Sequence, residues 1–365
     1  MRILVAPLNW GLGHASRCVP LIHRFLDEGH EVILGGDGAS LTLLRRHFPQ
    51  LRYVYLAPLN LRYSAGQCQV WAMIKAIPQL IRWAIKDHLL LRALLREEPF
   101  DLIISDNRFG LFLPSSYRRS RSYSETVLQQ SDPTGEAGQT QSVYITHQLH
   151  IMLPKGWRWA EGIASRLHAR IYTRYNKVWI PDYEAQEQSL AGKLSHPTTI
   201  VNRQSSNRQF EYIGPLSRFE IPRYRDSEIP HLYDVIAVLS GLEPQRSLLE
   251  KELIERFVGK EERVLIVQGL LNRPNTRLKH QNITVVPSLN DQELVPALLS
   301  AKHIIARSGY STIMDLHALG LIKNKEQKDN YQLSIINYQL ELIPTPGQPE
   351  QAYLAKWIAQ NDSFL

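Results

Sequence analysis

The feature that most constrains the fold is an apolar run that ends in Arg307-Ser308-Gly309 and leads directly into a helical pattern. The turn between such a strand and its helix directs backbone N–H groups and the positive end of the helix dipole at an anion. Asp315 comes around one helical turn later and brings a carboxylate close to the same turn. We therefore expect a nucleotide here, with its diphosphate at Ser308 and Gly309 and its ribose near Asp315.

A similar turn lies near the start of the chain, in the segment Asn9-Trp10-Gly11-Leu12-Gly13-His14. It follows a short apolar strand, and His14 stands at the opening of the next helix. Two such turns, separated by most of the chain, predict two α/β halves that face each other across a ligand. The positive end of the helix favours a neutral imidazole that can act as a base, and the alternative is a histidine that only caps the turn.

Composition limits the class of protein. The chain has 365 residues, 44% of them hydrophobic, which is enough for two globular domains. Charged residues interrupt every apolar run before the roughly 20 residues that a membrane span needs, and the first strand lacks the length of a signal peptide. Cys18 and Cys68 form neither a disulfide framework nor a metal cluster, so we expect a cytoplasmic protein.

The chain carries a net charge of +7, from 42 basic and 35 acidic residues. Diffuse positive charge favours phosphorylated ligands, anionic lipid or nucleic acid. A nucleic-acid-binding protein would show a basic stripe or an aromatic-basic motif, and the sequence has neither. We therefore expect no nucleic-acid partner.

Strands alternate with helices along the chain, which predicts mostly parallel sheets covered on both faces. The expected strands are 2–7, 31–35, 53–57, 102–105, 143–146, 178–181, 234–239, 264–268, 283–287, 303–306 and 340–344. Residues 1–214 form the expected first domain, 215–231 a proline-containing linker and 232–365 the second domain. Residues 114–141 and 321–339 are polar and interrupt this alternation, so we expect them to be insertions, the first a disordered loop.

The segment Gly11-Leu12-Gly13-His14-Ala15-Ser16 begins like a dinucleotide-binding fingerprint. Ser16 stands where the third glycine is needed, and Asp37 lies in range for a ribose contact. A partial match of this kind is weak evidence for a nicotinamide dehydrogenase.

Several motifs together resemble the GT-B glycosyltransferases, and among them glycosyltransferase family 28, which includes the lipid-linked N-acetylglucosamine transferase of peptidoglycan synthesis. The motifs, in order along the chain, are Val285–Asp291, the helical segment Leu294–Ser300, Ala306-Arg307-Ser308-Gly309 and the loop Pro344–Gln351. This resemblance implies two doubly wound Rossmann-like domains around a central cleft, the first for the acceptor and the second for a nucleotide-sugar donor.

The resemblance also implies roles for single residues. Ser308 and Gly309 would hold the diphosphate, and Asp315 would bind the ribose in place of the family's usual glutamate. Leu289 would lie beside the base, and Gln351 with Glu350 would contact sugar hydroxyls. His14 would be the general base or would position the acceptor.

Two elements depart from the family pattern. The loop Ser240–Arg246 keeps Gly241 and Arg246, which leaves a phosphate contact open, but it also contains Glu243, which we expect to face away. The chain continues only a short way beyond Gln351, so we expect a shortened or absent helix crossing back to the first domain.

The resemblance implies a reaction without an essential metal or other cofactor, and the sequence has no Asp-x-Asp triplet. Helix dipoles, backbone N–H groups and Arg307 or Arg246 would then neutralise the leaving diphosphate. Asp106 and Asn107 end one strand and His147 ends another, so these three residues are candidate acceptor contacts, His147 also as an acid or base. Each of these residues could equally serve only the local structure.

The segment 70–96 repeats apolar residues at helical spacing, with basic residues elsewhere on its surface. The apolar residues are Trp71, Ile74, Ile77, Ile81, Ile85 and Leu89. A core helix with a solvated face has this pattern, which is the interpretation we favour, and so has a helix on an anionic membrane. Trp157 and Trp159 lie beside Lys155 and Arg158 in a second aromatic-basic cluster.

The leading functional hypothesis is an inverting transfer of a sugar from a nucleotide diphosphate sugar, with uridine as the expected base, to a sugar, glycolipid or other hydroxyl acceptor. One alternative is a nucleotide-sugar hydrolase or epimerase of the same fold. Another is a binding subunit that keeps the fold without activity, which the altered loop at Glu243 would fit.

Overall fold

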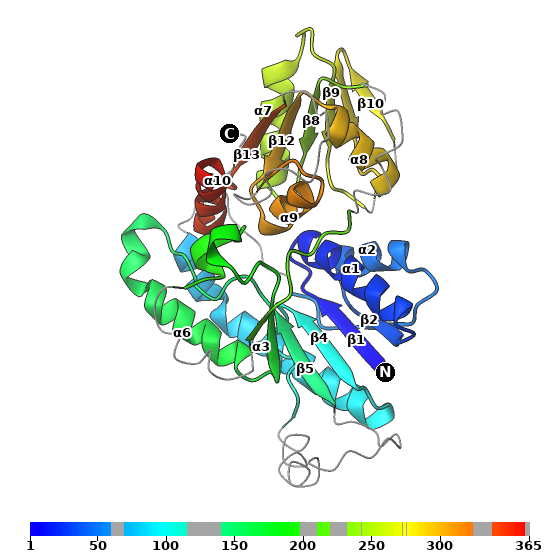
Figure 1. Ribbon diagram of the computed structural model, residues 1–365, viewed down its shortest axis with the longest axis vertical. Coiled ribbons are helices and arrows are strands. Elements are labelled where there is room, and N and C mark those ends of the chain that lie inside the picture. The colour runs from blue at the N-terminus through cyan, green and yellow to red at the C-terminus, as the bar shows by residue number, and fades with distance from the viewer. Residues whose placement is uncertain are drawn as a thin grey trace.

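The computed structural model describes residues 1–59, 69–114, 140–197, 210–219, 232–241, 243–271, 273–274, 276–323 and 338–361, with the side chains of 69–73 left out. The chain forms two α/β domains, stacked one above the other in Figure 1, each built on its own sheet. The expected linker from residue 220 to 231 lies outside the described residues, as do 115–139 and 324–337, most of the two expected insertions.

The first domain is built on a seven-stranded parallel sheet of order β3-β2-β1-β4-β5-β6-β7. Its strands are β1 (Arg2–Pro7), β2 (Glu31–Gly36), β3 (Tyr53–Tyr55), β4 (Leu102–Asp106), β5 (Gln141–Ile145), β6 (Lys177–Ile180) and β7 (Phe210–Tyr212). The strands are apolar on both sides because helices cover both faces, as parallel sheets require.

Alternate residues of β1 show which helices cover which face of this sheet. Ile3 and Val5 lie in one core with α1 (Gly13–Asp27) and α2 (Gly38–His47). Leu4 and Ala6 lie in the opposite core with α3 (Gln69–Glu97) and with Tyr172 of α6 (Glu161–Tyr172). Short 3₁₀ helices precede and follow α6, at Lys155–Ala160, Gln186–Gln188 and Gly192–Leu194.

The second domain has a six-stranded sheet of order β10-β11-β9-β8-β12-β13, in which β10 alone is antiparallel to its neighbour. Its strands are β8 (Val235–Val238), β9 (Val264–Val267), β10 (Leu278–His280), β11 (Ile283–Val286), β12 (His303–Arg307) and β13 (Gln339–Ile343). Helix α7 (Gln245–Phe257) covers one face, and α8 (Asp291–Ser300) with α9 (Tyr310–Ala318) covers the other.

A final helix that reaches the first domain is present, so the alternative that it is absent is wrong. Helix α10 (Pro349–Asn361) begins in the second domain and contacts the first (Figure 1). The Trp357 indole N–H donates to the Ser189 carbonyl at 3.0 Å, and the Lys193 amide donates to the Tyr353 hydroxyl at 2.8 Å. A Cβ on Gly192 would lie 2.4 Å from that hydroxyl oxygen, so the helix rests directly on the backbone of this loop.

The expected strands all occur, with ends that differ by one to a few residues. Strands β7 and β10, which contain three residues each and lie at the edges of their sheets, were not predicted. Short edge strands bury few side chains, so their apolar pattern is weak.

The preferred interpretation of α3 as a helix that buries its isoleucine row is wrong. Ile81, Ile85 and Leu89 are 55%, 53% and 56% exposed, whereas Trp83 and Leu91 are buried. Trp71 is among the residues whose side chains are not described. No helix in the described part of the chain is long and apolar enough to cross a membrane.

Candidate functional site

Both sheets reverse their strand order at a point where the two domains face each other. In the first sheet the reversal lies between β1 and β4, and in the second between β8 and β12. Open α/β sheets bind ligands beyond the carboxyl ends of the strands at such a point. His14 follows β1, Asp106 ends β4, and Ser308 follows β12, so the main predicted site residues of both domains lie at these two points.

His14 lies in the first turn of α1 and is held by Asp106. The His14 Nδ1 is 2.8 Å from an Asp106 carboxylate oxygen. The Asp106 side chain is fully buried, and Arg17, which is 1% exposed, donates two N–H groups to it. Burial alone would raise the pKa of Asp106, but the charges of Arg17 and His14 lower it to about 2.

Since this carboxylate only accepts, it favours a neutral His14 with the proton on Nδ1 and the lone pair on Nε2, and the Arg17 guanidinium lies 3.0 Å from the same Nδ1. No described residue bonds Nε2, and the side chain is 18% exposed. This arrangement makes His14 competent as a general base. Asp106, predicted as an acceptor contact, instead lies behind His14 and orients it.

The donor side is formed by the start of α9. Gly309 is the N-cap residue of α9, and no side chain caps the helix, so its first N–H groups are available to an anion. The Ser308 hydroxyl is buried and donates to the Gln351 carbonyl at 2.9 Å, which attaches α10 to the turn. The Gln351 side-chain oxygen accepts the Thr345 amide at 2.8 Å, while its Nε2 lies 3.9 Å from where a Gly309 Cβ would be. The Gln351 amide donors therefore lie beside the predicted diphosphate turn.

Asp315 lies on the second turn of α9. The Ser217 hydroxyl donates to it at 2.6 Å. Burial raises the pKa of Asp315 to about 6, although the Arg218 charge and the Ser217 hydrogen bond oppose this rise. The carboxylate is therefore held by the segment that joins the domains, through the Ser217 hydroxyl and the Arg218 backbone amide.

The two helix starts meet where the domains face each other. A Cβ on Gly13 would lie 2.6 Å from the Ser311 hydroxyl oxygen. Tyr310, the first residue of α9, donates its hydroxyl to the Pro181 carbonyl in the first domain at 2.7 Å. The turn of α1 that carries His14 and the first turn of α9 are thus in direct contact.

His147 also bridges the domains. Its Nε2 lies 2.8 Å from a Glu350 carboxylate oxygen, and its ring stacks on Tyr310 at 4.2 Å between centroids. Arg17 lies 3.4 Å from the other ring nitrogen, and burial lowers the pKa of His147. Gln148 donates to the second Glu350 oxygen. Both nitrogens of His147 are engaged, so it connects the domains and is not placed to act as a second acid or base, and Glu350 is engaged in the same contact.

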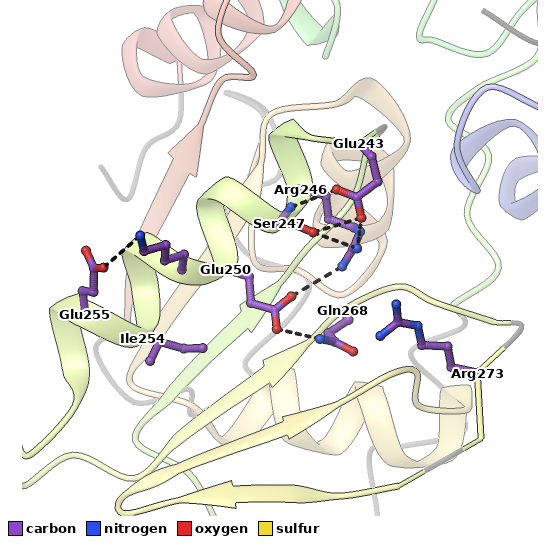
Figure 2. Close-up of a pocket in the computed structure, with 9 residues that line it drawn as sticks. Glu243, Arg246, Ser247, Glu250, Ile254, Glu255, Gln268 and Arg273 are labelled. Atoms are coloured by element: carbon purple, nitrogen blue, oxygen red, sulfur yellow. Dashed lines mark hydrogen bonds and ion pairs between the residues drawn. The ribbon is translucent and has the colours of Figure 1, made fainter. Parts of the chain in front are cut away.

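In the loop after β8, Glu243 binds the guanidinium of Arg246, and Glu250 lies 3.5 Å from that guanidinium. Figure 2 shows these three side chains around a hollow of about 400 Å³, which Gln268 and Arg273 also line. Two carboxylates therefore balance the charge of Arg246, the residue for which the sequence left a phosphate contact open. Gly241, with φ +100°, has open space where a Cβ would be.

The remaining candidates have structural contacts. Arg307 is buried and donates to the carbonyls of Gln245 and Pro344, at 2.8 and 3.1 Å. Asn107 has a φ of 56° and accepts the Tyr144 hydroxyl at 2.8 Å. Leu289 is half-buried against the core under α8. Asp37, the ribose candidate of the dinucleotide alternative, pairs with Arg108 at 2.9 Å, which weakens that alternative.

Arg17 is the main site residue that sequence reasoning missed. It lies three residues after His14 and one before the buried Cys18, so it faces the sheet from the same side of α1. A charged residue within an apolar helix face was the available signal, since a buried charge needs a partner.

Comparison with known proteins finds relatives that are named as glycosyltransferases. An uncharacterized glycosyltransferase of Methanosarcina acetivorans is 22% identical over 327 residues, which cover 88% of this chain and 78% of that protein. One from Methanosarcina mazei is 20% identical over 324 residues, with the same coverage of 88% and 78%. No protein-family model matches the sequence.

Solved structures give the same result at the level of the fold. The calicheamicin glycosyltransferase CalG4 has a TM-score of 0.53 at 12% identity, over 98% of this chain and 83% of that one. This chain has the GT-B fold. The spinosyn rhamnosyltransferase SpnG, solved with thymidine diphosphate, has a TM-score of 0.52 at 13% identity, over 97% of this chain and 84% of that one. In sequence and in fold, the chain is related to glycosyltransferases.

Proposed function

We propose that this GT-B protein transfers a sugar, with inversion and without a metal, from a pyrimidine nucleoside diphosphate sugar to an acceptor hydroxyl. The observation that carries the proposal is the His14–Asp106 pair, 2.8 Å apart, at the switch point of one sheet and opposite the uncapped start of α9 at the switch point of the other. A base and an anion site that face each other are the two parts that such a transfer needs.

In the proposed reaction, His14 Nε2 takes the proton of the acceptor hydroxyl as its oxygen bonds to the anomeric carbon. The bond from that carbon to the diphosphate oxygen breaks, and the diphosphate leaves with the electron pair. The N–H groups at the start of α9 and the amide of Gln351 stabilise the leaving charge. Attack from the side opposite the leaving group inverts the anomeric centre, and Asp106 stabilises the imidazolium that forms.

Two observations bear on the nucleobase of the donor, and they point to different nucleotides. The resemblance to family 28 favours uridine, whereas SpnG was solved with thymidine diphosphate. Asp315 would accept from ribose hydroxyls, and thymidine diphosphate has one hydroxyl fewer. We therefore expect UDP to bind more tightly than TDP in the wild type and this preference to shrink in Asp315→Ala.

The first test is calorimetric titration of the wild type and Asp315→Ala with UDP, TDP and GDP. Micromolar binding of a pyrimidine nucleotide that weakens in the variant supports the donor site. If none of the three nucleotides binds, the proposal is wrong, and a non-catalytic binding protein is favoured instead. The matching nucleotide sugars are then incubated with the protein and a panel of hydroxyl acceptors. Release of free sugar without an acceptor would identify a hydrolase instead.

The base is tested with His14→Ala, which should lower turnover by about 10²–10⁴-fold and leave nucleotide affinity nearly unchanged. His23→Ala is the matched control, because His23 lies on the same helix but is exposed. Equal turnover in the two variants would remove His14 from the reaction.

A further inference from the structure

Helix α3 presents a row of large apolar side chains to solvent. The exposed fractions of Ile74, Ile77, Ile81, Ile85 and Leu89 are 40%, 46%, 55%, 53% and 56%. Their spacing of three or four residues places them on one side of the helix. A soluble surface normally has single exposed apolar residues, whereas a continuous row indicates a binding surface.

A second row lies on the 3₁₀ turn before α6 and on α6 itself. Trp159, Ile163 and Leu167 follow one another at intervals of four residues and are 74%, 52% and 52% exposed. In Figure 1, α3 and α6 lie on the same side of the first sheet. Phe109 joins them, with ring centroids 5.7 Å from Trp83 of α3 and 6.4 Å from His168 of α6. We call the two rows together the apolar face.

Basic residues accompany both rows of the apolar face along their helices. On α3 they are Lys75, Arg82, Lys86, Arg92 and Arg96, and around α6 they are Lys155, Arg158, Arg166, Arg170 and Arg174. All ten are exposed, and none forms an ion pair with another residue of the described chain. Unpaired cations around an apolar surface mark a region whose counter-charge comes from outside the protein.

Acidic residues do not balance this charge. Asp87 of α3 is buried and binds Arg108 at 2.8 Å. Glu161 of α6 accepts the Leu153 amide at 3.1 Å and lies 3.2 Å from His150. Glu97 is the remaining acid on the described side chains of these two helices.

We propose that the apolar face and the cations on the same two helices bind the surface of a membrane that contains anionic phospholipid. Apolar side chains of a surface helix enter the boundary between headgroups and acyl chains, and flanking lysines and arginines bind the anionic headgroups. A second copy of the chain fits less well, because two such faces would bring like charges together and lysine is depleted in protein interfaces.

The first turns of the α3 row lie near the carboxyl ends of the strands of the first sheet. Trp83 of α3 donates its indole N–H to the Ala57 carbonyl, beyond the carboxyl end of β3, at 2.8 Å. The turns of α3 that precede Trp83 therefore extend past the sheet edge that carries His14 and Asp106. Membrane binding does not depend on the proposed transfer reaction, since it is measured without substrate.

The test is flotation of the full-length protein with vesicles of phosphatidylcholine alone or mixed with phosphatidylglycerol, at low and high salt. Binding to the mixed vesicles that weakens at high salt is expected, because salt screens the headgroup charge. Absence of binding to the mixed vesicles would overturn the proposal, whatever the protein does to nucleotide sugars.

Variants separate the two parts of the surface. Ile81→Glu with Ile85→Glu should weaken binding at least about tenfold, since two apolar side chains that would enter the membrane are replaced by charges that the headgroups repel. Leu248→Glu on α7 is the control, because Leu248 is 51% exposed and lies in the other domain. Arg166→Gln with Arg170→Gln should weaken binding by roughly fivefold per cation.

The positions are exposed, so each variant should keep the wild-type thermal midpoint and nucleotide affinity. Equal vesicle binding by the α3 variant and the Leu248 control would overturn the proposal. So would a wild type that is dimeric in light scattering, ignores vesicles and becomes monomeric in the α3 variant, since the face would then bind a second copy.

Discussion

Gly13 and Ser311 lie in direct contact across the cleft: a Cβ on Gly13 would be 2.6 Å from the Ser311 hydroxyl oxygen and 2.9 Å from its Cβ. The two residues belong to the first turns of α1 and α9, so this contact sets the distance between the base-bearing helix and the donor helix. Real Cβ atoms do not approach other atoms this closely. The absence of a side chain at Gly13 is therefore what allows the domains to close in this way.

Gly13→Ala should force the two helix starts apart. Because catalysis depends on alignment to within about 1 Å, turnover should fall by about tenfold or more, and the radius of gyration from small-angle scattering should rise. Ser311→Gly in the same chain removes both close atoms and should restore the wild-type values. Gly162→Ala is the control, because a Cβ there meets nothing within 4 Å. A fully active Gly13→Ala with unchanged scattering would contradict this account of closure.

Asp106→Asn should destabilise the folded protein strongly, because it leaves the guanidinium of Arg17 buried without a carboxylate. Breaking a buried pair in this way costs about 3–5 kcal/mol in the free energy of unfolding, measured by urea denaturation. Asp234→Asn is the comparison, since its partners Arg263 and Lys302 are exposed and such pairs contribute less than about 1 kcal/mol. Arg17→Met combined with Asp106→Asn should recover much of the lost free energy of unfolding. Equal losses in Asp106→Asn and Asp234→Asn would argue against a buried pair.

The sequence predicted the site residues that end or follow strands. His14, Asp106 and Ser308 could be found because the carboxyl ends of neighbouring parallel strands meet at one edge, whatever the rest of the fold. The contacts of Arg17 with Asp106 and of Glu350 with His147 could not be found in this way. Asp106 ends β4, and His147 belongs to the other domain from Glu350, so only the packing of α1 and α10 brings these partners together.

Helix α3 shows where periodicity fails. It carries one apolar row through Trp83, Leu91 and Leu95 and a second through Ile81 and Ile85, and both have helical spacing. Hydrophobic periodicity identifies the helix but not which of two apolar rows faces the sheet. Asp87 decides the orientation, because its buried pairing with Arg108 requires the first row to face inward.

Nucleotide affinity should depend on pH through Asp315. Burial raises its pKa to about 6, so the carboxylate that would accept ribose hydroxyls is present at pH 7.5 and mostly protonated at pH 5. UDP affinity measured by calorimetry should therefore be lower at pH 5 than at pH 7.5 in the wild type, and Asp315→Asn should show a smaller change.

The stability of the fold should also depend on pH through Asp315. The folded state favours the protonated carboxyl, so this group is most stabilising below the pKa of the unfolded chain, and its contribution is lost as the pH rises through about 6. Asp315→Asn should accordingly be at least as stable as the wild type at pH 7.5, and a less stable variant would contradict the raised pKa.

Acid should destabilise the first domain through His168. Burial lowers the pKa of this imidazole to about 4, and its Nε2 lies 3.3 Å from the Tyr144 hydroxyl oxygen. The unfolded chain takes up the proton near pH 6.5, whereas the folded protein takes it up only near pH 4. The contribution of neutral His168 to the free energy of unfolding is therefore complete above pH 6.5. It is lost as the pH falls toward 4, by about 3 kcal/mol in all. His168→Gln, which binds no proton, should show a smaller drop in the urea midpoint between pH 7 and pH 4.5 than the wild type. His23→Gln, at an exposed position of α1, should keep the wild-type drop. If the His168 variant loses stability as steeply as the His23 control, the acid response of the domain must come from other groups.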